Sequence, residues 1–173
     1  RQVDMGLYGM LIVEDQEHPF VEYPKRFLVF DDWKFPPISS DTEHSHLYED
    51  GNWLVNQHHQ PKIRVEEPTV FHVVNASNQG YLDIQWPNAL WVGGEQGFLG
   101  EPVTFEHLLL APADRATILD LGGEKDVVIQ PYSNHGGSTW EERSTLFSIE
   151  GDVFEEPSLP STIEPPTIDP QST

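Results

Sequence analysis

Short apolar runs separated by glycine, proline, asparagine and aspartate make up most of the chain. Residues 62–67 alternate, with Ile63 and Val65 predicted inward and charged neighbours outward, as in a half-buried strand. Residues 26–30 are apolar almost throughout, which predicts a strand buried on both faces. Further ranges with strand chemistry are 6–13, 69–75, 81–86, 116–121, 127–130 and 145–149. Helical periodicity is almost absent, so the pattern predicts an all-β sandwich or barrel.

Three regions depart from this strand pattern. Residues 35–51 are polar and contain a proline pair, and residues 132–142 contain a glycine pair, so both are predicted to be surface loops. From residue 152 onward, prolines alternate with acidic and hydroxyl residues, which predicts an extended, semi-rigid tail. Because the chain starts in a strand-like run and ends in a linker-like one, we expect it to be a piece of a longer protein.

The charge balance and the lack of cysteine exclude several classes of function. The chain has nine basic and 29 acidic residues, a formal net charge of −20, and such a surface repels phosphate backbones. No apolar run approaches the roughly 20 residues that a membrane helix needs. Without cysteine, the chain itself can form no disulfide, no thiolate nucleophile and no thiolate metal site. We therefore expect neither nucleic acid nor a membrane among its partners.

Several motifs follow one another in a fixed order. They are Gly6-Leu7-Tyr8-Gly9, FLVFDDW at 27–33, WLVN at 53–56, PKIRV at 61–65, FHVVNAS at 71–77, GFLGEPV at 97–103 and LAPADR at 110–115. In this order they resemble the end of the first and the whole of the second cupredoxin domain of the multicopper oxidases, the group of bacterial laccases, cuprous oxidases and bilirubin oxidases. The sequence departs from the family pattern at Gln57, where glycine is usual, at Asp114, which replaces glutamate, and at Glu95-Gln96, which replace aspartate.

The resemblance implies a cupredoxin-like Greek-key β-sandwich with an extra N-terminal strand and an extended, proline-rich C-terminal tail. Residues 1–15 would be the terminal strand of a preceding cupredoxin domain and residues 16–25 a linker. Residues 26–151 would form the second cupredoxin domain, and residues 152–173 a linker towards a third domain. The resemblance also implies a periplasmic or extracellular location, although the chain shows no targeting signal of its own.

Intact multicopper oxidases use copper to oxidise phenols or metal ions and to reduce dioxygen to water. A blue copper site needs imidazoles and a cysteine thiolate, and the resemblance places these ligands in the first and third domains, outside this chain. We therefore expect the chain alone to be inactive and to bind no copper of its own. Its expected role is that of an interdomain scaffold, whose partners are the remaining cupredoxin domains or a second copy of itself.

Histidines are the remaining candidates for metal ligands within the chain. His44 and His46 would face the same way on an extended backbone, and His58, His59 or His135 could add a further ligand. No spacing specifies that third ligand, so these side chains could equally be solvated loop imidazoles. By contrast, His72 and His107 adjoin apolar runs and are predicted to be sheet residues rather than ligands.

Two other functions remain open from the sequence. The chain could be one component of an oxidase assembled from several polypeptides. It could also be a carbohydrate- or ligand-binding sandwich that uses exposed tryptophans, although aromatic residues in β-proteins more often pack. The many pairs of adjacent carboxylates, such as Asp31-Asp32, would point apart on strands and do not predict a glycosidase site. Gly93-Gly94 and Gly122-Gly123 are predicted to be hairpin turns rather than phosphate-binding loops.

Overall fold

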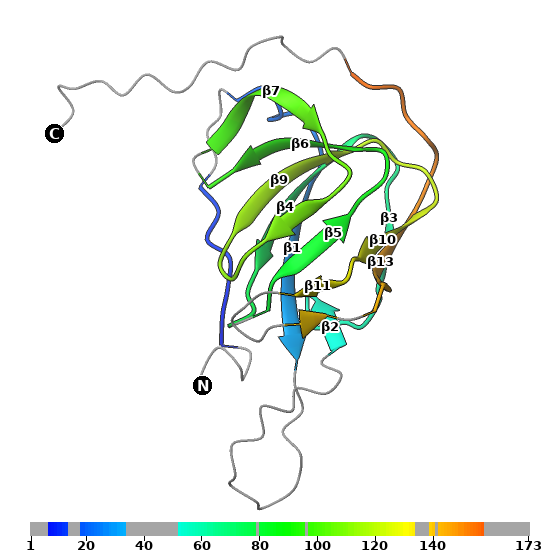
Figure 1. The fold of residues 1–173 in the computed structure, drawn as a ribbon. Helices are drawn as coiled ribbons and strands as arrows, with labels where there is room; N and C mark the ends of the chain where they lie inside the picture. The colour runs from blue at the N-terminus through cyan, green and yellow to red at the C-terminus, as the bar shows by residue number, and fades with distance from the viewer. Residues whose placement is uncertain are drawn as a thin grey trace, which may run out of the picture.

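The computed structural model describes residues 7–13, 18–33, 52–78, 80–95, 97–133, 139–140 and 142–157, and every regular element in these ranges is a strand (Figure 1). This confirms the predicted all-β class. The strands are β1 (Lys25–Trp33), β2 (Asn52–Val55), β3 (Lys62–Arg64), β4 (Thr69–Asn75), β5 (Leu82–Gln85), β6 (Ala89–Gly94), β7 (Gly97–Thr104), β8 (Leu108–Leu110), β9 (Arg115–Asp120), β10 (Lys125–Ile129), β11 (Tyr132–Ser133), β12 (Thr139–Trp140) and β13 (Ser144–Glu150). The described part of the chain includes no helix long and apolar enough to cross a membrane.

The strands form two main sheets and a small ribbon. The six-stranded sheet has the order β2-β1-β4-β9-β6-β7, and the five-stranded sheet has the order β3-β13-β10-β5-β8 (Figure 1). Strands β1 and β4 are parallel, as are β13 and β3, and the other pairings are antiparallel. Because each parallel pair joins strands from distant parts of the sequence, the arrangement depends on long-range contacts.

The main core lies between the two sheets and is centred on aromatic side chains. The indole of Trp86, which follows β5, meets the ring of Phe71 from β4 edge-on at a centroid distance of 5.1 Å. It meets the ring of Phe147 from β13 in the same way at 5.0 Å. All three side chains are almost completely buried. Trp86 therefore packs against both sheets and joins them through apolar contact.

A second apolar cluster covers the outer face of the six-stranded sheet. Strand β4 sends Phe71 and Val73 into the main core and Val70 to the opposite face, as the period of two requires. There Val70 packs with residues from β6 and β9 and with Phe20. Phe20 lies in the turns that precede β1 and is fully buried. The segment before the first strand thus closes the outer face of this sheet.

Several local predictions need correction. Residues 7–13 were predicted as a strand, but they have no strand partner among the residues that the structure describes. The run at 26–30 is buried on one face only, because Phe27 remains 37 % exposed on the other. Gly122-Gly123 does not close a hairpin, since β9 and β10 belong to different sheets. Strand β7 was missed because two glycines and Pro102 disfavour a central strand, and β7 is in fact an edge strand.

Candidate interdomain docking site

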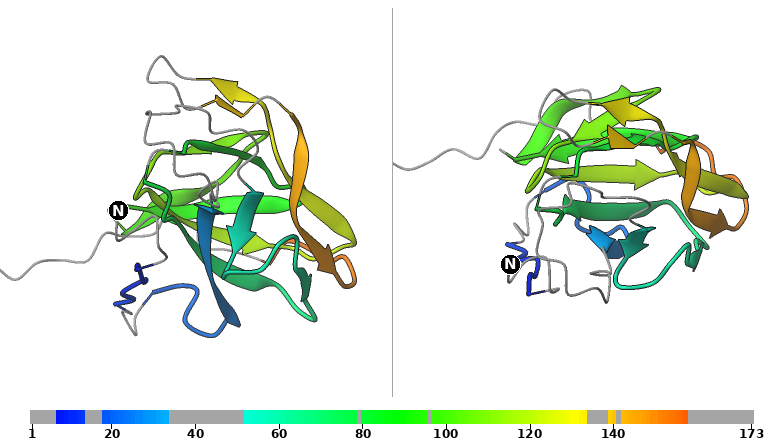
Figure 2. Two further views of the ribbon diagram at one scale, coloured as in Figure 1. Left: turned by 90° about the horizontal axis from the view of Figure 1, so that it is seen from below. Right: turned by 60° about the horizontal axis from the view of Figure 1, so that its bottom comes forward.

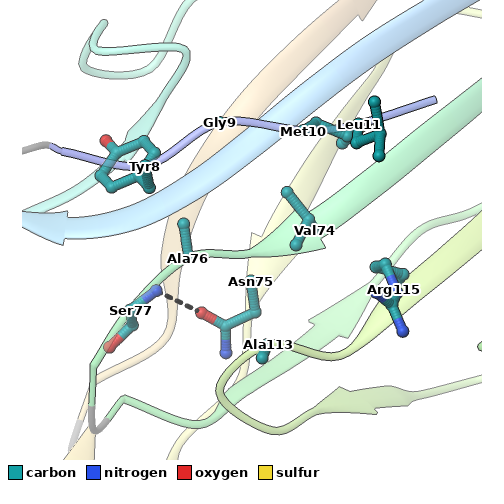
Figure 3. Close-up of a pocket in the computed structure, with 10 residues that line it drawn as sticks. All are labelled: Tyr8, Gly9, Met10, Leu11, Val74, Asn75, Ala76, Ser77, Ala113 and Arg115. Atoms are coloured by element: carbon teal, nitrogen blue, oxygen red, sulfur yellow. Dashed lines mark hydrogen bonds between the residues drawn. The ribbon is translucent and has the colours of Figure 1, made fainter. Parts of the chain in front are cut away.

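The N-terminal segment, residues 7–13, lies against the outside of the sandwich (Figure 2). Its residues 8–11 face residues 74–77 at the end of β4 across a groove of about 350 Å³ (Figure 3). Ala113 and Arg115, from the start of β9 and the turn before it, complete the groove lining. A segment from the beginning of the chain is thus held beside residues that are far away in the sequence. We call this arrangement the docking site.

Tyr8 fixes the N-terminal segment to the sandwich. Its hydroxyl donates a hydrogen bond of 2.8 Å to Oδ2 of Asp31 on β1, and Asp31 is 4 % exposed. Burial, and then the neighbouring Asp31 carboxylate, raise the pKa of the Tyr8 phenol, so it remains a donor at physiological pH. The sequence analysis expected adjacent carboxylates such as Asp31-Asp32 to point apart on a strand, and both residues do lie on β1. Asp31 is buried and meets a tyrosine 23 residues away, a partner that the local pattern did not predict.

A buried asparagine supports the floor of the docking site. Asn75 is fully buried, and its Nδ2 donates to the carbonyls of Gly80 at 2.8 Å and Leu110 at 2.9 Å. Its Oδ1 accepts a hydrogen bond of 3.0 Å from the Ser77 backbone N–H, and the Ser77 hydroxyl accepts one of 2.6 Å from Gly80 N. Every polar atom of the Asn75 side chain is therefore used, which fixes Ser77 and Gly80 relative to the end of β4.

The turn before β9 forms the other wall. Ala113 has a φ of +72°, and its N–H donates to the carbonyl of Asn75 at 2.8 Å. The Asp114 carboxylate accepts a hydrogen bond of 2.9 Å from Ala111 N. Asp114 thus closes the turn even though it replaces the glutamate of the family pattern. Next to it, Arg115 is paired with Glu95, whose Oε1 also accepts from Arg115 N at 2.7 Å.

The outward side of the N-terminal segment is apolar and uncovered. The exposed fractions are 68 % for Leu7, 90 % for Leu11 and 88 % for Val13. Met10, in contrast, is partly buried within the groove. Three large apolar side chains within seven residues form a surface that gains stability when a second protein surface covers it.

The histidine candidates are not brought together in the described part of the chain. His58 and His59 follow β2 in an exposed turn, where His58 Nδ1 lies 2.8 Å from the carbonyl of Asn56. His44, His46 and His135 lie outside the described residues and stay predictions. Among the residues that are placed, no three histidine, aspartate or glutamate side chains gather in a way that could hold a metal ion. The histidines of the described residues therefore do not form a copper centre.

His72 lies within β4, as predicted. Its ring stacks on Phe27 with a centroid distance of 5.4 Å, and its Nδ1 lies 3.2 Å from the Thr117 hydroxyl. His107 was also predicted to be a sheet residue, but it is exposed just before β8, with its Nδ1 3.4 Å from Oδ1 of Asp83. Sequence reasoning did not identify Tyr8 or Asn75 as functional residues. The one sequence feature that could have pointed to them is that each lies in a motif similar to the family pattern, Tyr8 in residues 6–9 and Asn75 in residues 71–77.

Solved structures of multicopper oxidases share this fold. An oxidase from Campylobacter jejuni, described as a metallo-oxidase, matches with a TM-score of 0.70 and 19% identity, over 92% of this chain and 37% of its own. An oxidase from Pseudomonas thermotolerans matches with a TM-score of 0.63 and 16% identity, over 98% of this chain and 42% of its own. The chain therefore has the cupredoxin-type fold of the multicopper oxidases, which confirms the resemblance found in the sequence.

Curated relatives with greater sequence identity carry a different description. The cell division protein FtsP of Salmonella typhimurium is 35% identical in an alignment of 135 positions that covers 69% of this chain and 28% of the relative. FtsP of Escherichia coli is 30% identical in an alignment of 146 positions that covers 75% of this chain and 30% of the relative. The chain thus spans less than a third of the length of these relatives. No protein-family model matches it.

Proposed function

We propose that this chain is the middle cupredoxin unit of a larger, multicopper-oxidase-like protein and serves there as a scaffold that docks its neighbours. The observation that carries the proposal is the docking site. The hydrogen bond from Tyr8 to Asp31 holds the N-terminal segment against the sandwich, while the side chains of Leu11 and Val13 are almost fully exposed. A segment fixed on one side and apolar on the other is suited to contact two domains at once.

For the whole protein we propose a structural role in cell division, in the periplasm or outside the cell. This is supported by the two relatives named FtsP above, which are 30% and 35% identical to the chain, against 16% and 19% for the two oxidases. The chain also contributes no thiolate, because it has no cysteine.

A subunit of an oxidase assembled from several chains is the second candidate function, and the fold that the chain shares with the multicopper oxidases favours it. Such an oxidase would have to take its copper ligands from its other chains.

Light scattering after size-exclusion chromatography tests the docking proposal. The purified chain is expected to associate with itself as its concentration rises, because covering Leu11 and Val13 removes apolar surface from water. The double variant Leu11→Glu/Val13→Glu places two charges on that surface and is expected to be monomeric over the same range.

A matched pair of substitutions provides the control. Val103 and Leu109 are 42 % and 44 % exposed, and neither lines the docking site. Val103→Glu/Leu109→Glu adds the same two charges elsewhere and should leave the association unchanged. A wild-type chain that stays monomeric at every concentration would contradict the proposal, as would equal effects of the two double variants.

A further inference from the structure

A second groove, of about 500 Å³, lies between the beginning of β1 and strand β3. Its lining includes Lys25, Arg26, Lys62 and Arg64, which are four of the nine lysine and arginine residues of the chain. It shares no lining residue with the docking site. A chain with a formal net charge of −20 thus concentrates nearly half of its cations in one groove. We call this the basic groove.

Two cations of the basic groove, Lys62 and Arg64, are accessible to a binding partner. The side chains of Lys62 and Arg64 are 71 % and 78 % exposed. Lys62 pairs with Glu150 at 2.9 Å, and Arg64 pairs with Glu66 at 3.0 Å. Both ion pairs are exposed to solvent and therefore contribute little stability. An incoming carboxylate can exchange with these weak pairs, so the groove can receive a ligand of negative charge.

One side of the basic groove is an open sheet edge, because β3 is the terminal strand of the five-stranded sheet. On the other side, β2 pairs with β1 only from Phe30 onward. Before that point Asn56 occupies the β1 edge, since its side chain bonds Val29 N at 2.8 Å and Phe27 O at 2.9 Å. An open edge such as that of β3 is where an extended polypeptide segment adds to a sheet.

The spacing of the cations matches that of alternate residues in a strand. Lys62 and Arg64 are two residues apart on β3 and both exposed, whereas Ile63 between them is partly buried. Their Cα atoms are therefore about 6.6 Å apart along the strand. In an extended peptide, side chains at alternate positions have the same separation. Acidic residues at every second position can thus face both cations together.

We propose that the basic groove binds an extended, acidic polypeptide segment of a partner protein, with alternate carboxylates facing Lys62 and Arg64. Lys25 and Arg26 add positive charge on the β1 side. Glu150, Glu66, Glu124 and Asp126 oppose this charge around β3, so the attraction is local and short in range. A long nucleic acid would extend beyond the groove and meet the acidic remainder of the surface, whereas a short acidic segment does not.

Fluorescence anisotropy with labelled octapeptides tests this proposal on the full chain. A peptide of alternating threonine and glutamate is expected to bind, and one of alternating threonine and glutamine is not. A peptide with four threonines followed by four glutamates should bind more weakly than the alternating one, because its acidic side chains point to opposite sides of an extended backbone. Binding should weaken as salt is added.

Matched variants locate the binding site. Arg64→Gln should weaken binding of the acidic peptide by about two- to fivefold, and Lys62→Gln/Arg64→Gln should weaken it further. Arg143→Gln also removes one arginine, but outside the basic groove, and should leave the affinity unchanged. Glu66→Gln removes the carboxylate that pairs with Arg64 and should tighten binding, a gain that damage to the fold would not produce.

Equal binding of the glutamate and glutamine peptides would overturn the proposal. So would equal effects of Arg64→Gln and Arg143→Gln, or a single-stranded oligonucleotide that binds more tightly than the acidic peptide. Because the two grooves are lined by different residues, this experiment can fail while the docking proposal stands, and the reverse also holds.

Discussion

At the scale of single residues, the buried pair of Asp120 and Lys125 shows how this fold accommodates charge. The Asp120 carboxylate accepts hydrogen bonds from Trp86 Nε1 at 2.6 Å and from Gly122 N at 2.8 Å, and Lys125 Nζ lies 2.7 Å from it. Burial raises the pKa of Asp120 and lowers the pKa of Lys125, so desolvation outweighs their attraction for both groups. The pair therefore adds little net stability, but losing one partner is costly.

Replacing only the cation should expose this cost. Lys125→Met leaves the Asp120 carboxylate buried without its counter-ion, and the free energy of unfolding at pH 7 should fall by about 3–5 kcal/mol. The pKa of Asp120 in the folded variant then lies above the unfolded value of about 3.9, so the folded state binds more protons between these two values. The free energy of unfolding should therefore rise as the pH falls through the pKa that Asp120 has in the folded variant, towards the pKa that it has in the unfolded chain. Urea unfolding at several pH values would measure this change.

A double variant separates charge from packing. Asp120→Asn/Lys125→Met keeps an acceptor for Trp86 Nε1 but removes both charges, and it should recover most of the lost stability without the pH dependence. If Lys125→Met alone were as stable as the wild type at pH 7, the carboxylate would have to be better solvated than its complete burial implies.

At the scale of elements, the connection between β9 and β10 carries the chain from one sheet to the other and holds the segment after β13. Gly122 and Gly123 have φ values of +71° and +91°. Gly123 N donates to the carbonyl of Asp152 at 2.8 Å, and Phe154 N donates to that of Leu121 at 2.8 Å. The ring of Phe154 packs against the main core. The beginning of the predicted tail is thus fixed to this connection.

Gly122→Ala should disrupt this connection. A Cβ at Gly122 would collide with the carbonyl of Asp152 and lie 2.6 Å from the Phe154 ring, and its φ of +71° disfavours any side chain. We expect a loss of about 2–4 kcal/mol in the free energy of unfolding. Gly100→Ala on β7 is the matched control, because a Cβ there meets nothing within 4 Å, and it should change stability by less than about 1 kcal/mol. Similar losses in both variants would show that the Gly122 geometry is unimportant.

At the scale of the whole molecule, negative charge dominates the surface. The chain has 20 more acidic than basic residues, and one of the few cations, Lys125, is buried. Mutual repulsion of the remaining charges opposes compaction of the chain, and dissolved salt screens it over roughly 10 Å at 0.1 M. The sandwich core must therefore compensate for this repulsion.

Moderate salt should consequently stabilise the protein. Raising sodium chloride from about 0.02 M to 0.3 M shortens the screening length several-fold, and the melting temperature should rise by a few degrees. Scanning calorimetry at pH 7 measures this directly. A melting temperature that fell over this range would mean that attractive ion pairs, such as Lys62–Glu150 and Arg115–Glu95, outweigh the general repulsion.

Much of the architecture was predictable from local pattern. The strand at 69–75 was predicted with the bounds that β4 has, and Ile63 and Val65 point inward as alternation required. The turn after β2 shows the limit of residue preferences, because Gln57 adopts a φ of +68° at a position where the family pattern has glycine. The hydrogen bonds between Val55 and His58 close that turn without glycine.

The sequence by itself determined the all-β class, seven of the thirteen strands in the described residues, the sandwich and the absence of a thiolate, because these depend on side-chain periodicity and composition. Only the tertiary structure decided which distant groups meet. It brings Tyr8 to Asp31, joins Asn75 to Leu110, buries Phe20 on the outer sheet face and gathers the cations of β1 and β3 in one groove. Such contacts depend on how the sheets pair and pack, and a local pattern of hydrophobic and polar residues does not record that pairing.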